Sequence, residues 1–166
     1  MLRERVLAEM ELVFKEIPYG IAHTMRVLAN ADEIMAKEGV SERAAEVVTY
    51  AAILHDIGAV RALKKYGSLD GCYQEIEGPA VAKDILQRVG VDEAVIVRVE
   101  YITGNHHTPA KIDDLDFQIL WDADLLDGLE YGEKDSDAEH LRQKIESSFQ
   151  TDSGKSLALN RLGFVE

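Results

Sequence analysis

The sequence is poor in three features that would each point to a class of protein. Of its 166 residues only Cys72 is a cysteine, so no disulfide can form within the chain. It has no run of about 18 apolar residues, which argues against a membrane-spanning helix. Basic residues are outnumbered by acidic ones, 18 to 31, and the formal charge of −13 argues against a surface that follows the phosphates of a long nucleic acid. Without a signal-peptide pattern, we expect a cytoplasmic protein that binds no membrane.

Strand-like alternation of apolar and polar residues is also missing, whereas apolar residues recur at helical spacing. With 46% hydrophobic residues, the chain can build one buried core, and we expect a single domain that is all-α. Ser41 and Asp92 are predicted N-caps. Tyr19-Gly20 is expected to form a turn, and Gly78-Pro79 to begin a helix. The predicted helices are 2–17, 21–37, 42–56, 60–66, 79–89, 93–103, 117–129, 137–149 and 157–162.

One stretch, LHDIG at residues 54–58, stands out because an apolar helix ends there in an imidazole and a carboxylate. His55 continues the face of Val48 and Ala51, and Asp56 extends an adjacent apolar row. A buried carboxylate normally acquires a partner charge, a metal or a proton. A single histidine at such a place is usually a hydrogen-bonded core residue, so the interpretation depends on partners elsewhere.

Two other predicted helices offer such partners. His23 begins an inward face, and the strongly apolar 117–129 helix carries Asp122, Asp124 and Asp127. Two imidazoles and two carboxylates suit divalent ions such as Mn, Fe, Co, Ni or Zn. Periodicity does not decide between Asp122 and Asp124, because both have apolar neighbours three or four residues away.

The order of these residues resembles the H…HD…D signature of the HD-domain metal-dependent phosphohydrolases. His23, then LHDIG at 54–58, then WDADLLD at 121–127 carry the resemblance, which covers roughly residues 20–130. It implies a compact single-domain helical bundle over residues 1–166, with 131–166 as a helical extension. It also implies that His23, His55, Asp56 and Asp124 bind a divalent metal, Mg included, leaving Asp122 and Asp127 as supporting or solvent-facing residues.

The resemblance implies hydrolysis of a small phosphate ester, such as a nucleotide, by metal-activated water that Asp56 both binds and orients. Relatives with two metals add histidines between the HD pair and the last aspartate, and His106 and His107 resemble the last of these. The earlier one is replaced by Gln74, a poor metal ligand, so one or two ions are expected. Gln74 also counts against a di-iron oxygenase of the myo-inositol oxygenase type. A metal- or nucleotide-sensing module without catalysis is the other alternative.

Five further residues complete the predicted site. His106 and His107 are expected to bind the substrate phosphate or a second metal. Glu75 and Glu77 are candidate catalytic acids or bases, with Glu77 also a candidate ligand of the second metal, or else residues of an acidic helix start. Lys64 is a candidate phosphate contact, or part of a solvated helix face. A homo-oligomer is compatible with this interpretation.

Overall fold

The computed structural model describes residues 1–132, 134 and 137–165, and these contain helices and no strand. The all-α prediction is therefore confirmed. The elements are α1 (Leu2–Val13), α2 (Pro18–Glu38), α3 (Glu42–Leu54), α4 (Ala59–Tyr66), α5 (Gly71–Val89), α6 (Glu93–Thr103), the 3₁₀ helix η1 (Pro109–Lys111), α7 (Leu115–Tyr131), α8 (Ala138–Ser148) and α9 (Asp152–Arg161).

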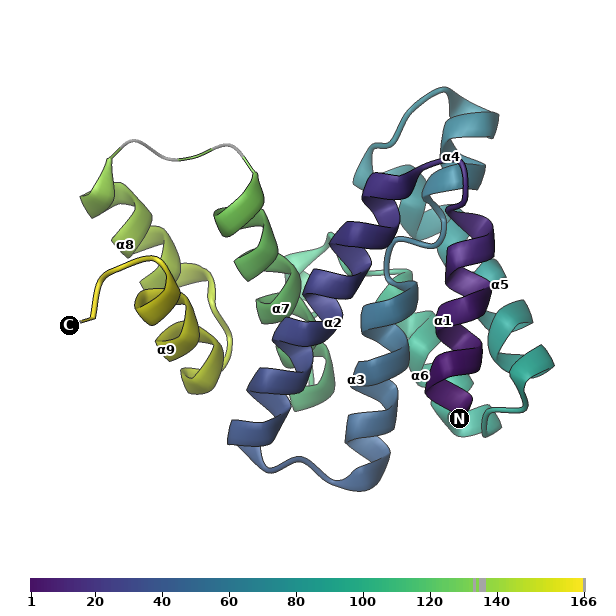
Figure 1. The fold of residues 1–166 in the computed structure, drawn as a ribbon, viewed down its shortest axis with the longest axis horizontal. Coiled ribbons are helices and arrows are strands. Elements are labelled where there is room, and N and C mark those ends of the chain that lie inside the picture. The colour runs from purple at the N-terminus through teal and green to yellow at the C-terminus, as the bar shows by residue number, and fades with distance from the viewer. Residues whose placement is uncertain (133, 135–136, 166) are drawn as a thin grey trace.

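The core is organised around α3, which lies between α2 and α6 (Figure 1) and also packs on α1 and α7. Ser41 caps its start by accepting a hydrogen bond from the backbone N–H of Ala44 at 3.2 Å, as the sequence predicts. Val48, Ala51 and Leu54 have no exposed surface, because neighbouring helices cover the C-terminal part of this helix. Its C-terminal end is therefore an enclosed place for polar side chains.

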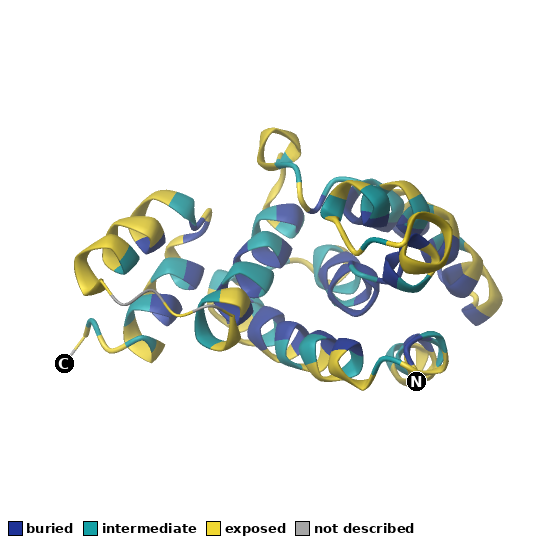
Figure 2. Ribbon diagram, turned by 90° about the horizontal axis from the view of Figure 1, so that it is seen from above, coloured by how far each residue is buried: buried dark blue, intermediate teal, exposed yellow. Residues whose placement is uncertain are grey.

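The remaining helices form two groups on either side of this core. At one end α5 packs on α6, α4 and α1, while at the other end α9 packs on α7 and α2, with α8 against α9 (Figure 1). The buried residues lie on the faces that the helices turn toward one another (Figure 2). No helix in the described part of the chain has both the length and the apolar character needed to cross a bilayer.

The first turn differs from the sequence prediction. α1 ends at Val13, and α2 already begins at Pro18, so Tyr19 and Gly20 lie in its first turn and do not form the connection. Proline suits the first position of a helix because its missing N–H would have no partner there. Gly20 is required by packing, since a Cβ at this position would lie 2.6 Å from the ring of Phe14.

Gly78-Pro79 does not begin a helix, as the sequence suggested, but lies inside α5. A proline in a helix interior costs about 3 kcal/mol relative to alanine. The buried apolar face of α5 stabilises the helix despite this cost. Gly58 and Gly78 allow a close backbone contact, because a Cβ on Gly58 would lie 2.6 Å from the backbone N of Gly78. This contact brings α5 against the turn that follows Asp56.

Candidate metal centre

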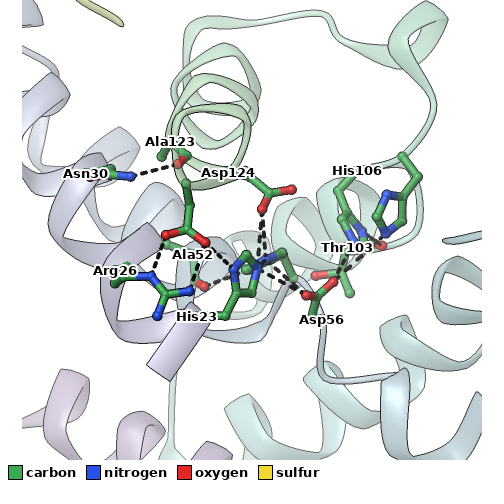
Figure 3. Close-up of polar contacts among 12 residues, drawn as sticks. His23, Arg26, Asn30, Ala52, Asp56, Thr103, His106, Ala123 and Asp124 are labelled. Atoms are coloured by element: carbon green, nitrogen blue, oxygen red, sulfur yellow. Dashed lines mark hydrogen bonds and ion pairs between the residues drawn. The ribbon is translucent and has the colours of Figure 1, made fainter. Parts of the chain in front are cut away.

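Four side chains predicted to bind metal come together beside the C-terminal end of α3. His23 lies in the second turn of α2, His55 caps α3, Asp56 follows it, and Asp124 lies within α7. The Nε2 atom of His23 lies 3.0 Å from Nε2 of His55, 3.2 Å from Oδ2 of Asp56 and 3.3 Å from Oδ1 of Asp124. Both carboxylates are turned toward the His23 ring (Figure 3).

These spacings match those of atoms that share one ion. Metal–nitrogen and metal–oxygen bonds of about 2.1 Å place neighbouring ligand atoms about 3.0 Å apart at right angles and about 3.4 Å apart in a tetrahedron. The Nε2 atom of His55 is likewise 3.5 Å from Oδ2 of Asp56 and 3.6 Å from Oδ1 of Asp124. His23, His55 and Asp56 therefore fit a single divalent cation, and the Asp124 oxygen lies within ligand spacing of both histidines.

The hydrogen bonds of two histidines leave the correct nitrogen free for a metal. Nδ1 of His55 lies 2.8 Å from the carbonyl oxygen of Ala52, and Nδ1 of His106 lies 2.8 Å from that of Thr103. A carbonyl oxygen can only accept, so Nδ1 carries the proton in each ring. In the neutral ring Nε2 then keeps its lone pair, which is the arrangement that metal-binding histidines have.

His23 is oriented by a side chain in place of a backbone carbonyl. Its Nδ1 donates to Oδ2 of Asp127 at 2.7 Å, and Arg26 donates to Oδ1 of the same carboxylate at 2.6 Å (Figure 3). His23 and Arg26 are three residues apart on α2, and Asp124 and Asp127 are three apart on α7, so each pair shares a helix face. The Asp127 side chain is only 4% exposed. It therefore supports the metal centre from behind and does not face solvent.

A second group of donors adjoins the first and shares Asp56 with it. Oδ1 of Asp56 lies 3.1 Å from Nε2 of His106 and 3.9 Å from Nε2 of His107. His23, His55 and Asp56 offer ligand atoms that all lie within 4.8 Å of one another, and so do Asp56, His106 and His107. The two oxygens of Asp56 thus face different histidines.

Charge in the cluster is balanced between the rings and the carboxylates. Burial disfavours protonation of His23, but hydrogen bonds to Asp124 and Asp56 outweigh it and raise the pKa of this ring to about 11. Burial also favours the neutral form of Asp56, yet His55, His106 and His23 hold the pKa of this carboxyl well below 3.8. The cluster is thus built to keep its carboxylates ionised beside a positive charge, which a metal ion supplies directly.

A cavity of about 260 Å³ opens on this cluster. His23 and Asp56 form one side of it, and Gln74 lies on another. Its remaining wall comes from apolar and aromatic residues of the α1–α2 turn, of α4 and of the loop before α5, which include Phe14 and Leu69. Lys64, a predicted phosphate contact, lines a different cavity together with Arg61.

Glu75 and Glu77 flank Gln74 on α5 but have other contacts. Glu75 accepts from the backbone N–H of His107 at 2.8 Å and from the Thr108 hydroxyl at 2.9 Å. Glu77 pairs with Nζ of Lys65 at 2.8 Å and with the hydroxyl of Tyr66 at 2.9 Å. Successive residues of a helix point about 100° apart, so neither glutamate shares the direction of Gln74. Glu75 holds the segment that carries the histidine pair, and Glu77 faces α4.

Asp122, the alternative to Asp124 in the sequence, is buried on another side of α7. Its Oδ1 accepts from the N–H of Gln150 at 2.7 Å, and its Oδ2 accepts from the N–H and hydroxyl of Thr151 at 2.8 and 2.7 Å. Burial raises the pKa of Asp122 to about 6 against the effect of these hydrogen bonds. Asp122 therefore anchors the start of α9 and takes no part in the metal centre.

A comparison with protein families identifies the family in which this arrangement belongs. The profile of the HD domain matches residues 20–145, which is well over half of the chain. The chain belongs to the HD domain family. The match includes the five residues of the two donor groups and also Asp124, so the family assignment and the observed cluster concern the same part of the molecule.

This HD domain is also similar to a solved structure over nearly its whole length. The crystal structure of a predicted HD superfamily hydrolase from an uncultured Thermotogales bacterium superposes with a TM-score of 0.71 at 26% sequence identity. The similarity covers 97% of this chain and 85% of that one. No curated protein sequence matches this HD domain.

Proposed function

We propose that this HD domain is a metal-dependent phosphohydrolase that acts on small phosphate esters. The observation that carries the proposal is that an oxygen of Asp56 and one of Asp124 lie 3.2 to 3.6 Å from two histidine Nε2 atoms, which are 3.0 Å apart, beside a cavity. Membership of the HD domain family and similarity to a solved protein described as a hydrolase support metal-dependent hydrolysis. The phosphate ester is our inference from the chemistry of the site.

A metal ion is needed for this chemistry because the residues around the cavity provide little other positive charge to bind an anion. Among the described residues that line it, none is a lysine or an arginine, and Asp56 is itself negative. His23, His55, Asp56 and Asp124 would hold the ion. When bound in such a ligand set, a divalent ion polarises a phosphoryl oxygen and lowers the pKa of water towards neutrality.

The protein residues have separable tasks in this proposal. Asp56 is positioned to hold an attacking water, because one carboxylate oxygen faces His23 and the other faces His106. His107, about 38% exposed, lies at the open side of the same carboxylate. Burial and the neighbouring His106 lower the pKa of His107, so its ring is neutral near pH 7 and can bind either a metal or a phosphate oxygen.

We further propose that Asp56, His106 and His107 hold a second ion. His106 donates from Nδ1 to a carbonyl, so its Nε2 lone pair faces the Asp56 carboxylate at 3.1 Å, and two acceptors at this distance require a proton or a cation between them. Elemental analysis of protein purified without chelators is expected to give two ions per chain for the wild type and one for His106→Ala. One ion in both proteins would contradict the second site.

The enzymatic proposal is tested with phosphomonoesters and phosphodiesters assayed in the presence of Mn, Co, Ni or Mg. We expect wild-type protein to release phosphate or the free monoester only when metal is present, and Asp56→Ala to lose this activity. Asp114→Asn is the matched control, because Asp114 is exposed and its side chain does not cap α7. Wild-type turnover no greater than that of Asp56→Ala would contradict hydrolysis.

The same experiments separate the alternatives. Metal binding without turnover of any ester would favour a sensing module. Iron in the purified protein together with consumption of oxygen would favour a di-iron oxygenase. Gln74 counts against the oxygenase, because an amide is a poor metal ligand and stands where a second histidine would be needed.

A further inference from the structure

Gln74 has a buried hydrogen-bonding atom without a partner beside the metal centre. The residue is 9% exposed and lines the cavity that contains His23 and Asp56. Its Oε1 is buried and accepts no hydrogen bond from any described residue. Buried polar side-chain atoms nearly always have a partner in the protein, in water or in a ligand, so this oxygen needs an explanation.

The orientation of the amide is fixed by its neighbour. The other end of the side chain lies 2.7 Å from the carbonyl oxygen of Leu69, which can only accept a hydrogen bond. The NH₂ group must therefore face Leu69, and the oxygen is the atom left free. A partner for Gln74 must then be a hydrogen-bond donor, such as a hydroxyl, an N–H group or water, or else a cation.

The cavity around Gln74 restricts what can carry this donor. Its volume of about 260 Å³ lies just below the usual range for ligand pockets, about 300–1,000 Å³. Phe14, Ile17, Tyr19, Ala59 and Leu69 supply its apolar and aromatic wall. No lysine or arginine is found among the described residues that line it, so a second anionic group would have no counter-charge. The space suits a small uncharged group with apolar surface.

We propose that Gln74 is a specificity residue whose Oε1 accepts a hydrogen bond from the alcohol part of the substrate. This inference rests on the proposed phosphohydrolase function, with the phosphate held at the metal centre. The substrate is then a phosphate ester of a small, uncharged alcohol of about ring size that carries a hydroxyl or amino donor. A site built to receive such a donor discriminates strongly against an analogue that lacks it, because the buried acceptor is then left unpaired.

The test uses benzyl phosphate and a series of benzyl phosphates with one hydroxyl or amino group on the ring. For wild-type protein loaded with Mn, we expect kcat/KM for the best ring-substituted ester to exceed that of benzyl phosphate at least about tenfold. Gln74→Met, which keeps the length of the side chain and removes the acceptor, is expected to abolish this difference, so that the kcat/KM values of the variant for the two esters agree within about twofold. Equal loss for both esters, or no preference in the wild type, would overturn the inference.

A binding measurement separates this inference from the hydrolase proposal. The matching ring-substituted benzyl alcohols, which contain no phosphate, are titrated by calorimetry into metal-free protein. We expect the best alcohol to bind wild type at least about tenfold more tightly than Gln74→Met. Donor-dependent binding without turnover of any ester would support the role of Gln74 and overturn the hydrolase. Metal-dependent turnover with no effect of the donor would support the hydrolase and overturn the role of Gln74. A preference for an ester with a second phosphate on its ring would overturn the inference that the alcohol part is uncharged.

Discussion

The Nδ1 atom of His23 lies 2.7 Å from Oδ2 of Asp127, a buried carboxylate that also receives two hydrogen bonds from Arg26. This contact fixes which nitrogen of His23 is protonated and directs the other nitrogen at Asp56 and Asp124. The two remaining histidines with buried rings use backbone carbonyls for the same purpose. Of these three histidines, His23 is the one that depends on a side chain for its orientation, and a substitution can therefore test it.

Asp127→Asn is expected to weaken metal binding about 10- to 100-fold, as loss of a carboxylate behind a metal-binding histidine does elsewhere. The amide would also turn a donor toward either Arg26 or His23. Competition with a chelator of known affinity measures the effect for Zn or Mn. Asp122→Asn is the matched control, because it changes a buried aspartate of the same helix whose partners are Gln150 and Thr151. Equal metal affinity in both variants would contradict this role of Asp127.

The three aspartates of α7 show how much of the site could be predicted from the sequence. Their different tasks could not be read from periodicity, because α7 packs against α2, α3 and α9 and is apolar on several faces. The HD signature pointed to Asp124, and the structure brings this residue to His23. The roles of Asp122 and Asp127 depend on contacts with residues about 28 and 104 positions away along the chain. No local pattern encodes such contacts.

The same limit applies on α5. The resemblance put Gln74 at the position of a missing histidine, but its free oxygen depends on the Leu69 carbonyl and on the walls of the cavity. Glu75 and Glu77 were predicted as catalytic residues because carboxylates near a metal motif commonly act so. Packing of α5 on α4 and on the 106–108 segment decides their actual contacts. Pro79 was misplaced for a related reason, since tertiary packing overrides a local helix-breaking preference.

Asp122→Ala should lower the free energy of unfolding by about 1–3 kcal/mol, because the N–H groups of Gln150 and Thr151 lose a buried acceptor. Urea denaturation of metal-free protein measures this loss. Because Asp122 contacts no residue of the donor groups, the metal content of the folded variant should equal that of the wild type. A variant that keeps full stability, or one that folds but loses metal, would contradict the anchoring role.

Gly58→Ala should destabilise the protein by about 1–3 kcal/mol through overpacking. The added Cβ would lie 2.5 Å from the carbonyl oxygen of Gln74 and 2.6 Å from the N of Gly78, and neither backbone atom can move without shifting α5. Since Gly58 has φ of −74°, alanine fits its backbone and any loss arises from this contact. Gly128→Ala on α7 is the control, because nothing lies within 4 Å of its Cβ position. It should raise stability by up to about 1 kcal/mol. Equal stability of the two variants would contradict close packing at Gly58.

A pH-dependent contribution to stability is expected from the ion pair that precedes α7. Arg98 donates to both oxygens of Asp113 at 2.9 and 2.6 Å, and also to Asp116. The Arg98 guanidinium lowers the pKa of Asp113 below its ordinary value of 3.8 in the folded protein. A carboxyl with a lowered pKa stabilises the folded state above its ordinary pKa, and the contribution is lost as the pH falls through the folded value. The pair should therefore act fully at pH 5 to 7 and fade below about pH 4.

Asp113→Asn removes this contribution and is compared with wild type by urea denaturation at pH 7, 5 and 3. Because the Asp113 side chain is 42% exposed, solvent screening limits the expected loss at pH 7 to about 0.5 kcal/mol. The difference between the two proteins should be the same at pH 5 and smaller at pH 3, where the wild-type carboxyl begins to protonate. Asp114→Asn, which alters the neighbouring exposed aspartate, should show no such change with pH. A gap between Asp113→Asn and wild type that widens toward pH 3 would show that another group is responsible.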